Sequence, residues 1–341
     1  KDERARIRRT SSLNRMLEYL AAKEIVYPTQ IDAMTWEDYP VFRKSVMKNT
    51  RKTELKDIGT FCRLFLVPRG YLTNEIAMGK TFIPRITIGD DELDANPAIT
   101  PSDYKIINSY LRSQFVQEAT TYSGEYSRRM FATYVHLLKN SGCRPSELLA
   151  LRRKDIEITN PKRWSESKQM WEDNYKLKLH IRTSKTGKRR DVLCRSNAAD
   201  NLLQFLKYQR GWLNANHFTF TIKDESLVFG NPKEHFDKTL HYRRFDKMWH
   251  DIRSALHNQI EGNRFSERPY TLYSLRSTFI EDCIADGLDV YLTARLCGNT
   301  VAVIQKHYDR HDVLKRAEEV QSLPFGKTKP PEVETIDVMS I

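Results

Sequence analysis

The sequence predicts a mainly α (α+β) protein: a helical amino-terminal domain followed by a mostly helical second domain with one small antiparallel β-sheet. Three observations lead to this prediction. Most segments repeat apolar residues at helical spacing, whereas residues 176–194 alternate apolar and polar residues as paired strands do. The chain of 341 residues is about twice the length of a typical single domain. A stretch rich in acids, Gly and Pro interrupts the helical pattern near residue 90.

The first domain is predicted at residues 11–89, after a short basic segment at residues 1–10. Apolar residues such as Leu13 and Leu17 recur here every three or four positions. Thr35 is expected to cap a helix, because it precedes two acids that suit a helix amino terminus. The expected helices are at residues 11–25, 35–50 and 52–70.

A linker is expected at residues 90–101, and the second domain at residues 102–323, with Ser102 capping its first helix. The tail at residues 324–341 contains several prolines and is expected to be extended or disordered.

A β-hairpin with a basic tip is expected at residues 176–194. Leu177 and Leu179 alternate with polar residues, the chain turns at Gly187, and the pattern resumes at Val192. The flanking segments, residues 198–213 and 241–260, have helical periodicity.

The composition favours a polyanionic partner, since the formal net charge is +12. Nucleic acid is the favoured choice, although anionic membrane surfaces and acidic proteins would also attract such a chain. The five cysteines are scattered without a CxxC pair, so neither a disulfide framework nor a zinc site is indicated. With no long apolar run and no secretory signal, we expect a cytoplasmic protein with no membrane partner. The chain begins at Lys1, so an amino-terminal part can be missing.

The segment SGCRPSELLALRRKDI begins at Ser141 and holds the first candidate site residues. Gly142 is expected to end one helix, and Arg144 to begin another with Glu147 three residues later. Such a turn can direct a guanidinium into a cleft while Glu147 holds its neighbours. On its own, the segment is weak evidence, because an ordinary arginine at a helix start with a surface glutamate is the more common explanation.

The hairpin tip SKTGKRR contains Lys185, which can reach a substrate groove and donate a proton or bind phosphate. The alternative is a solvated basic turn. Lys188, Arg189 and Arg190 beside it are candidates for phosphate contacts only.

The segment at residues 271–312 is the strongest signal in the chain. Arg276 is expected to open a helix, a turn follows at Gly287, and a second helix ends at Gly298. Tyr308 then lies near the end of a third helix.

These segments together resemble the catalytic domain of tyrosine recombinases, the phage-integrase family, over residues 97–323. The family pattern TGLRxSELLxLxxxDI is similar to the segment that begins at Ser141, and the hairpin lysine falls at Lys185. The terminal boxes HxLRHTFA and LLGHxxxxTTxxYxH correspond to YSLRSTFI and RLCGNTVAVIQKHYDR, with nine residues from Asn299 to Tyr308.

The resemblance implies that Tyr308 is the nucleophile, with Glu147 in a supporting role. Two positions depart from the family pattern: Tyr273 replaces the first histidine and Asn299 replaces the histidine or tryptophan after the glycine. Both can donate hydrogen bonds to a phosphate oxygen, but neither titrates near neutrality. The resemblance further implies catalytic roles for Arg144, Arg276 and Lys185.

The chemistry suits these residue types. Phosphodiester exchange passes through a five-coordinate phosphorus with extra negative charge, which two arginines can stabilise without a metal or other cofactor. The covalent link to tyrosine conserves the energy of the broken bond, so rejoining needs no ATP. The resemblance implies site-specific DNA recombination and integration, with the protein encoded by a mobile genetic element in a prokaryotic host.

The expected partner is double-stranded DNA at attachment sites, bound by a homotetramer with a possible accessory DNA-bending protein. Arg243 and Arg244 are candidates for further phosphate contacts, with a solvated helix face as the equal alternative. The helix expected after Tyr308 can dock on a neighbouring protomer or in cis.

Two other functions stay open. The departures at Tyr273 and Asn299 are compatible with a DNA-binding protein of this fold that has weakened strand cleavage. Type IB topoisomerase activity shares the same chemistry.

Overall fold

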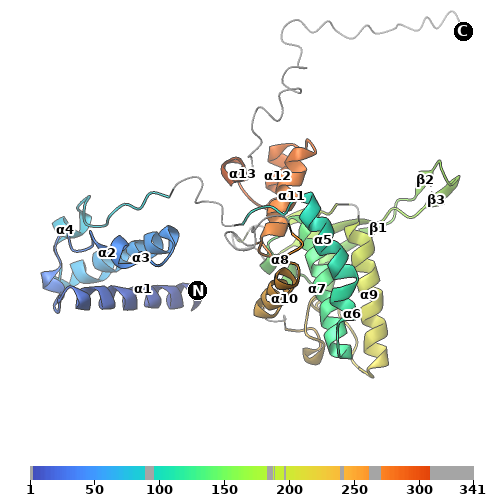
Figure 1. Cartoon of the computed structure of the whole chain (residues 1–341), viewed down its shortest axis with the longest axis horizontal. Helices are drawn as coiled ribbons and strands as arrows, with labels where there is room; N and C mark the ends of the chain where they lie inside the picture. Colours follow the sequence, from blue (N-terminus) through green and yellow to red (C-terminus); the bar gives the residue numbers. More distant parts are fainter. Residues whose placement is uncertain are drawn as a thin grey trace, which may run out of the picture. The chain divides into compact units, whose positions relative to one another are not determined.

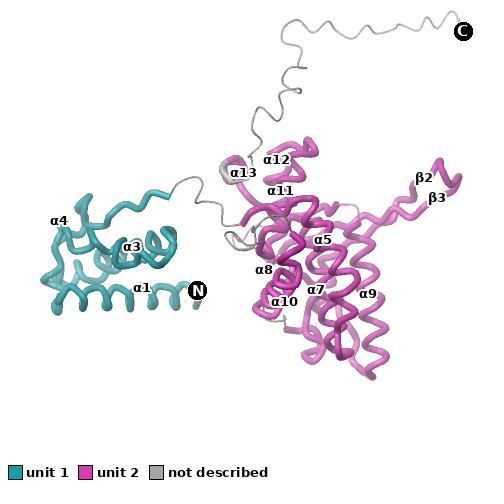
Figure 2. Tube along the Cα trace, viewed as in Figure 1, with its two compact units in different colours: residues 1–94 teal, residues 95–341 magenta. Residues whose placement is uncertain are grey.

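The computed structural model describes residues 3–88, 96–182, 187, 189–195, 197–238, 242–260 and 270–307. The chain divides into two compact units, Lys1–Asp94 and Ala95–Ile341 (Figure 2). This division falls inside the range that the sequence assigns to the linker.

Unit 1 is helical, but its helices differ from the predicted ones. Residues 3–10 are not a separate segment, because they form the first half of the first helix. The single helix expected at residues 35–50 is also wrong: after turns, a helix of four residues forms, and the next begins only at Lys48. The elements are α1 (Glu3–Ala22), η1 (Pro28–Gln30), α2 (Tyr39–Phe42), α3 (Lys48–Phe61), the π-helical turn η2 (Cys62–Leu66), η3 (Val67–Arg69) and α4 (Asn74–Met78).

The core of unit 1 is aromatic. Trp36 is fully buried, and the ring of Tyr19 stacks on it with centroids 5.7 Å apart. Trp36 also meets the edge of Phe82 at 6.5 Å. These rings join residues far apart in the sequence, and unit 1 therefore has a hydrophobic core of its own.

Unit 2 is also mainly helical (Figure 1). Its first helix is capped by Thr100, whose Oγ1 accepts a hydrogen bond from the Asp103 amide, and not by Ser102 as expected. The helix predicted at residues 198–213 is confirmed, whereas the one predicted at residues 241–260 is shorter, because α10 ends at Ala255. The elements are α5 (Pro101–Arg112), α6 (Gln114–Gln117), α7 (Tyr122–Ser141), α8 (Pro145–Leu149), η5 (Arg153–Asp155), α9 (Ala198–Ala215), η6 (Pro232–Glu234), α10 (Tyr242–Ala255), α11 (Ser274–Ala285), α12 (Val290–Cys297) and α13 (Val301–His307).

The predicted hairpin is confirmed as β4 (Lys176–Ile181) and β5 (Arg190–Leu193), which pair antiparallel with Leu179 opposite Val192. Both of these side chains are fully buried, because the alternation places one strand face against the helices. The sequence missed β1 (Ile156–Thr159), which pairs with the other edge of β4. It also missed a two-stranded sheet of β2 (Arg163–Ser165) and β3 (Met170–Glu172), which projects from the helices (Figure 1).

Helix α7 runs through the core of unit 2. Its Phe131 and Tyr134 contact Phe245 of α10 with ring centroids 5.3 and 4.7 Å apart. Tyr134 also meets Phe229 edge-on at 5.3 Å. The fold class predicted from the sequence, mainly α with a small antiparallel sheet, is thus confirmed. No helix in the described part of the chain is long and apolar enough to cross a membrane.

Gly142 ends α7 in the left-handed conformation, with φ of +60°. A Cβ atom at this position would lie 2.3 Å from Cδ1 of Phe279 on α11. Two features therefore favour glycine here: the left-handed backbone conformation and the close approach of Phe279 on α11.

We expect Gly142→Ala to destabilise unit 2 by about 3 kcal/mol, combining the left-handed backbone cost with overpacking against Phe279. Gly287 is a matched control, since its φ is +78° but a Cβ atom there would meet no described atom within 4 Å. Gly287→Ala should cost only about 1 kcal/mol. Chemical denaturation would compare the two, and equal losses would contradict the contact with Phe279.

Candidate active site

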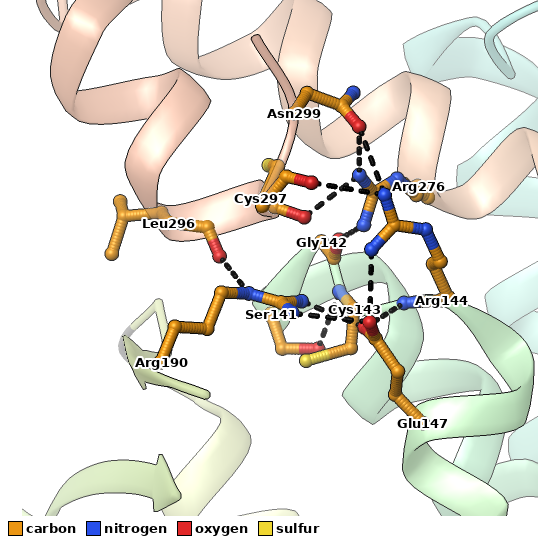
Figure 3. A network of polar contacts seen from close by, with 11 residues as sticks. Ser141, Gly142, Cys143, Arg144, Glu147, Arg190, Arg276, Leu296, Cys297 and Asn299 are labelled. Atoms are coloured by element: carbon orange, nitrogen blue, oxygen red, sulfur yellow. Dashed lines mark hydrogen bonds and ion pairs between the residues drawn. The ribbon is translucent and has the colours of Figure 1, made fainter. Parts of the chain in front are cut away.

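Three arginines converge on the carboxyl end of α12 (Figure 3). The last carbonyls of a helix have no partner within it and carry the negative end of the helix dipole. Here three successive carbonyls each accept a hydrogen bond from a different guanidinium. The pairs are Arg190 Nε to Leu296 O at 2.8 Å, Arg276 Nη2 to Cys297 O at 2.8 Å, and Arg144 Nη2 to Gly298 O at 2.9 Å.

The three arginines come from separate elements. Arg144 is the N-cap of α8, directly after the turn that Gly142 and Cys143 make at the end of α7. Arg276 lies in the first turn of α11, and Arg190 is the first residue of β5. The sequence predicted the local positions of Arg144 and Arg276, and the structure brings both to α12.

Glu147 lies between two of the arginines. Its carboxylate accepts from Arg144 Nη1 at 2.9 Å and from the Arg144 amide at 2.8 Å. On the other side, Arg190 donates through Nη1 at 3.0 Å and Nη2 at 2.7 Å. Burial alone would raise the pKa of Glu147, but the hydrogen bonds from Arg190 and Arg144 outweigh it and lower the pKa. The carboxylate therefore stays ionised inside the protein.

Asn299 connects the two arginines that the resemblance implies are catalytic. Its Oδ1 accepts from Arg276 Nη2 at 2.8 Å and from Arg144 Nη2 at 3.2 Å. The side-chain oxygen must face the two arginines, because in the flipped orientation the NH₂ group would point at two other N–H donors. Figure 3 shows the NH₂ group directed away from both guanidinium groups. It is thus positioned to donate to a ligand oxygen.

Arg276 is fully buried, and no carboxylate among the described residues pairs with it. Its other hydrogen bond goes to Gly142 O at 2.6 Å, so all its partners are neutral oxygens. A buried cation without a counter-ion is costly. The arrangement therefore favours binding of an anion.

Tyr273 lies at the start of α11, one turn before Arg276, and is half-buried. Its carbonyl accepts from the Arg276 amide at 3.0 Å. Its hydroxyl makes no hydrogen bond with another described residue. Burial and, to a smaller extent, the charges of Asp246 and Tyr273 raise the pKa of Tyr242 on α10.

The arginines that the sequence proposed as phosphate contacts differ in exposure: Arg189, Arg243 and Arg244 are exposed, whereas Arg190 belongs to the cluster just described. The Arg190 side chain is only 9% exposed and turns inward to Glu147, a position that the basic turn in the sequence did not indicate. Arg243 and Arg244 lie on α10, and Arg244 donates to Ser127 Oγ at 2.8 Å.

Lys185, Lys188 and Tyr308 lie outside the described residues. The structure does describe the chain on either side of the hairpin tip, in β4 and β5, and describes α13 up to His307, the residue before Tyr308. Within the described ranges no group of histidine, cysteine or acidic side chains could hold a metal ion.

We expect Glu147→Gln to destabilise unit 2 by about 3 kcal/mol at pH 7, because it leaves two buried arginines without their counter-ion. The pKa of Glu147 is lowered from 4.5, so its contribution is complete above that pH and disappears as the pH falls through the lowered value. The difference from wild type in denaturation experiments should therefore shrink in acid. Glu157→Gln is the control, since the exposed pair of Glu157 with Lys178 should contribute little.

No family model matches the chain, and no curated protein matches it by sequence. Solved structures do match it. The Tn1549 transposon integrase in complex with circular intermediate DNA is 12% identical; the match covers 86% of this chain and 87% of that chain, with a TM-score of 0.56. The XerH site-specific recombinase bound to palindromic difH substrate is 17% identical over 92% of this chain and 77% of that chain, with a TM-score of 0.57.

A lambda integrase dimer bound to a COC' core site is 14% identical, over 91% of this chain and 90% of that chain, with a TM-score of 0.57. Identities this low carry information about architecture alone. The chain therefore has the fold of the tyrosine recombinases.

Proposed function

We propose that the chain is a tyrosine-type site-specific recombinase, which cleaves and rejoins DNA strands through a 3'-phosphotyrosyl intermediate. One observation carries this proposal: the guanidinium groups of Arg144, Arg190 and Arg276, one fully and two largely buried, converge on one carboxylate and one amide oxygen. Ionised Glu147 compensates one of the three charges. The excess of positive charge suits a phosphodiester, whose negative charge grows in the transition state.

The geometry supports separate tasks within the cluster. The Arg144 side chain is 13% exposed and is the guanidinium that a phosphate oxygen can reach. Arg276 supplies positive potential from its buried position. Asn299 holds the two together through Oδ1 and offers its NH₂ group to the same ligand. The hydroxyl of Tyr273 is a further donor for a phosphate oxygen.

Tyr308 is the proposed nucleophile, on the strength of its spacing from Asn299. Its phenol loses its proton to solvent, and the resulting oxygen forms a bond to phosphorus while the bond from phosphorus to the 5'-oxygen breaks. Lys185, the proposed general acid, protonates the departing 5'-oxygen. In the reverse direction, the 5'-hydroxyl of another strand attacks the phosphotyrosine and releases Tyr308.

The proposed partner is double-stranded DNA. The net charge of +12 supports it, and so do the structural neighbours, because XerH and lambda integrase are described as bound to their DNA sites. Arg189, Arg243 and Arg244 are proposed phosphate contacts, as are Lys185 and Lys188. Assembly into a tetramer and an accessory bending protein stay predictions from the resemblance.

Tyr308→Phe should abolish covalent attachment to DNA while leaving binding intact, because only the nucleophilic oxygen is lost. The protein would be incubated with a nicked attachment-site substrate from the DNA beside its gene, and adducts resolved under denaturing conditions. The wild type should give a denaturation-resistant adduct.

Two outcomes would contradict the proposal. Binding without an adduct in either protein would indicate a DNA-binding protein of this fold that has lost cleavage. Relaxation of supercoiled plasmids that lack the site, at the same rate as plasmids that carry it, would indicate a type IB topoisomerase.

Asn299→Leu should slow cleavage roughly 100-fold, because it removes both the acceptor shared by the arginines and the donor to phosphate. Asn299→His should retain most of the activity, since a neutral imidazole keeps one acceptor and one donor. Single-turnover cleavage at saturating DNA would measure both. Equal cleavage rates for Asn299→Leu and the wild type would show that Asn299 does not contribute to cleavage.

A further inference from the structure

Arg190 has an unusual position for a residue of a basic turn. The sequence around it, SKTGKRR, suggests a solvated charge, yet its side chain is only 9% exposed. All three of its guanidinium nitrogens are engaged, two by the carboxylate of Glu147 and one by the carbonyl of Leu296. The guanidinium is therefore held by the protein on every nitrogen.

We propose that Arg190 is a positioning residue for strand cleavage, which holds Glu147 and the end of α12 so that Arg144 and Asn299 meet the same phosphate. The inference rests on the proposed function. It adds a residue that acts through others and does not itself touch DNA.

Arg190 fixes the carboxylate of Glu147. It grips both carboxylate oxygens at 2.7 and 3.0 Å, in the two-pronged geometry that a lysine cannot reproduce. Those same oxygens accept the side chain and the amide of Arg144. The orientation of the Arg144 guanidinium therefore depends on a carboxylate that Arg190 holds from the other side.

Arg190 also supports the turn before Asn299. Gly298 has a φ of +66°, and a Cβ atom there would lie 3.0 Å from Arg190 Nη1. The backbone thus packs directly on the flat guanidinium, while Arg190 Nε binds the carbonyl of Leu296 two residues earlier. Since this turn determines where the Asn299 amide lies, Arg190 positions Asn299 as well as Arg144.

The hairpin is connected to the cluster through the same residue. Arg190 pairs with Ile181 in the β4–β5 ladder, so it is fixed to the strand pair whose tip carries Lys185. Its contacts with α8 and α12 connect this strand pair to the arginine cluster. A single side chain therefore connects the hairpin to the segments that carry Arg144 and Asn299.

The charges around Glu147 predict a specific pH effect. Arg144 faces it from α8, Arg190 from β5, and Cys143 from the turn before α8. Burial raises the pKa of Cys143 to about 11, so this thiol is neutral. Without Arg190, burial of Glu147 would be opposed by Arg144 alone, and the pKa of Glu147 would rise. A protonated Glu147 would no longer hold Arg144.

The test compares Arg190→Gln and Arg190→Lys with wild type in single-turnover cleavage at saturating DNA, across a range of pH. Arg190→Gln should cleave roughly 100-fold more slowly, because the reacting groups lose their alignment. As the solution is acidified, Arg190→Gln should also lose activity at a higher pH than wild type does, because the pKa of Glu147 is higher in the variant. Arg190→Lys keeps the charge, so it should restore the wild-type pH profile while its rate stays reduced.

Arg43→Gln is a matched control, since Arg43 makes a similar two-pronged pair with buried Glu54 in unit 1. It should lower the melting temperature without shifting the pH profile of cleavage. Both Arg190 variants would be checked by melting and DNA affinity, and Arg190→Lys still tests the idea if Arg190→Gln does not fold.

Three results are distinguishable. A wild-type rate and pH profile in both variants would overturn the inference. Weakened DNA affinity with an unchanged cleavage rate would overturn it too, showing instead that Arg190 is a phosphate contact. If wild type itself forms no adduct, the proposed function fails; the positioning role would then be judged by whether Arg190→Gln lowers the protection of the Arg144 amide from hydrogen exchange.

Discussion

The interaction on which the site depends is the capping of α12 by arginine side chains. Three unpaired carbonyls at one helix end need donors, and three guanidinium groups supply them. Because Arg144, Arg190 and Arg276 come from α8, β5 and α11, this one helix end fixes the relative positions of four elements. The helix dipole adds a favourable field for positive charge.

The same contacts leave the cluster short of negative charge. The carbonyls and the Asn299 amide satisfy hydrogen bonds without neutralising a cation, and Glu147 is the one carboxylate among the described residues that forms an ion pair there. The protein thus organises the arginines largely with neutral acceptors, which leaves a net positive charge in the cluster. A second carboxylate would have made a more stable cluster and a weaker anion site.

The structure shows what the two departures from the pattern, Tyr273 and Asn299, contact. At position 299 an indole could only donate and a neutral imidazole could accept through one nitrogen, whereas the Asn299 amide accepts from two arginines and can donate outward. The departure is compatible with an organised site. Tyr273 keeps its place next to Arg276, with a hydroxyl that no described residue engages.

The sequence alone determined the local features: the hairpin, the glycine that ends α7, and the helices that carry Arg144 and Arg276, since each depends on neighbouring residues. Capping at Thr100 and the break in residues 35–50 were missed because nearby residues offered equally good local signals. Only the tertiary structure decided that the Arg190 side chain is buried against Glu147. Its partners are 43 and 106 residues away, and whether a charged side chain faces solvent or a buried carboxylate depends on the packing of those distant elements.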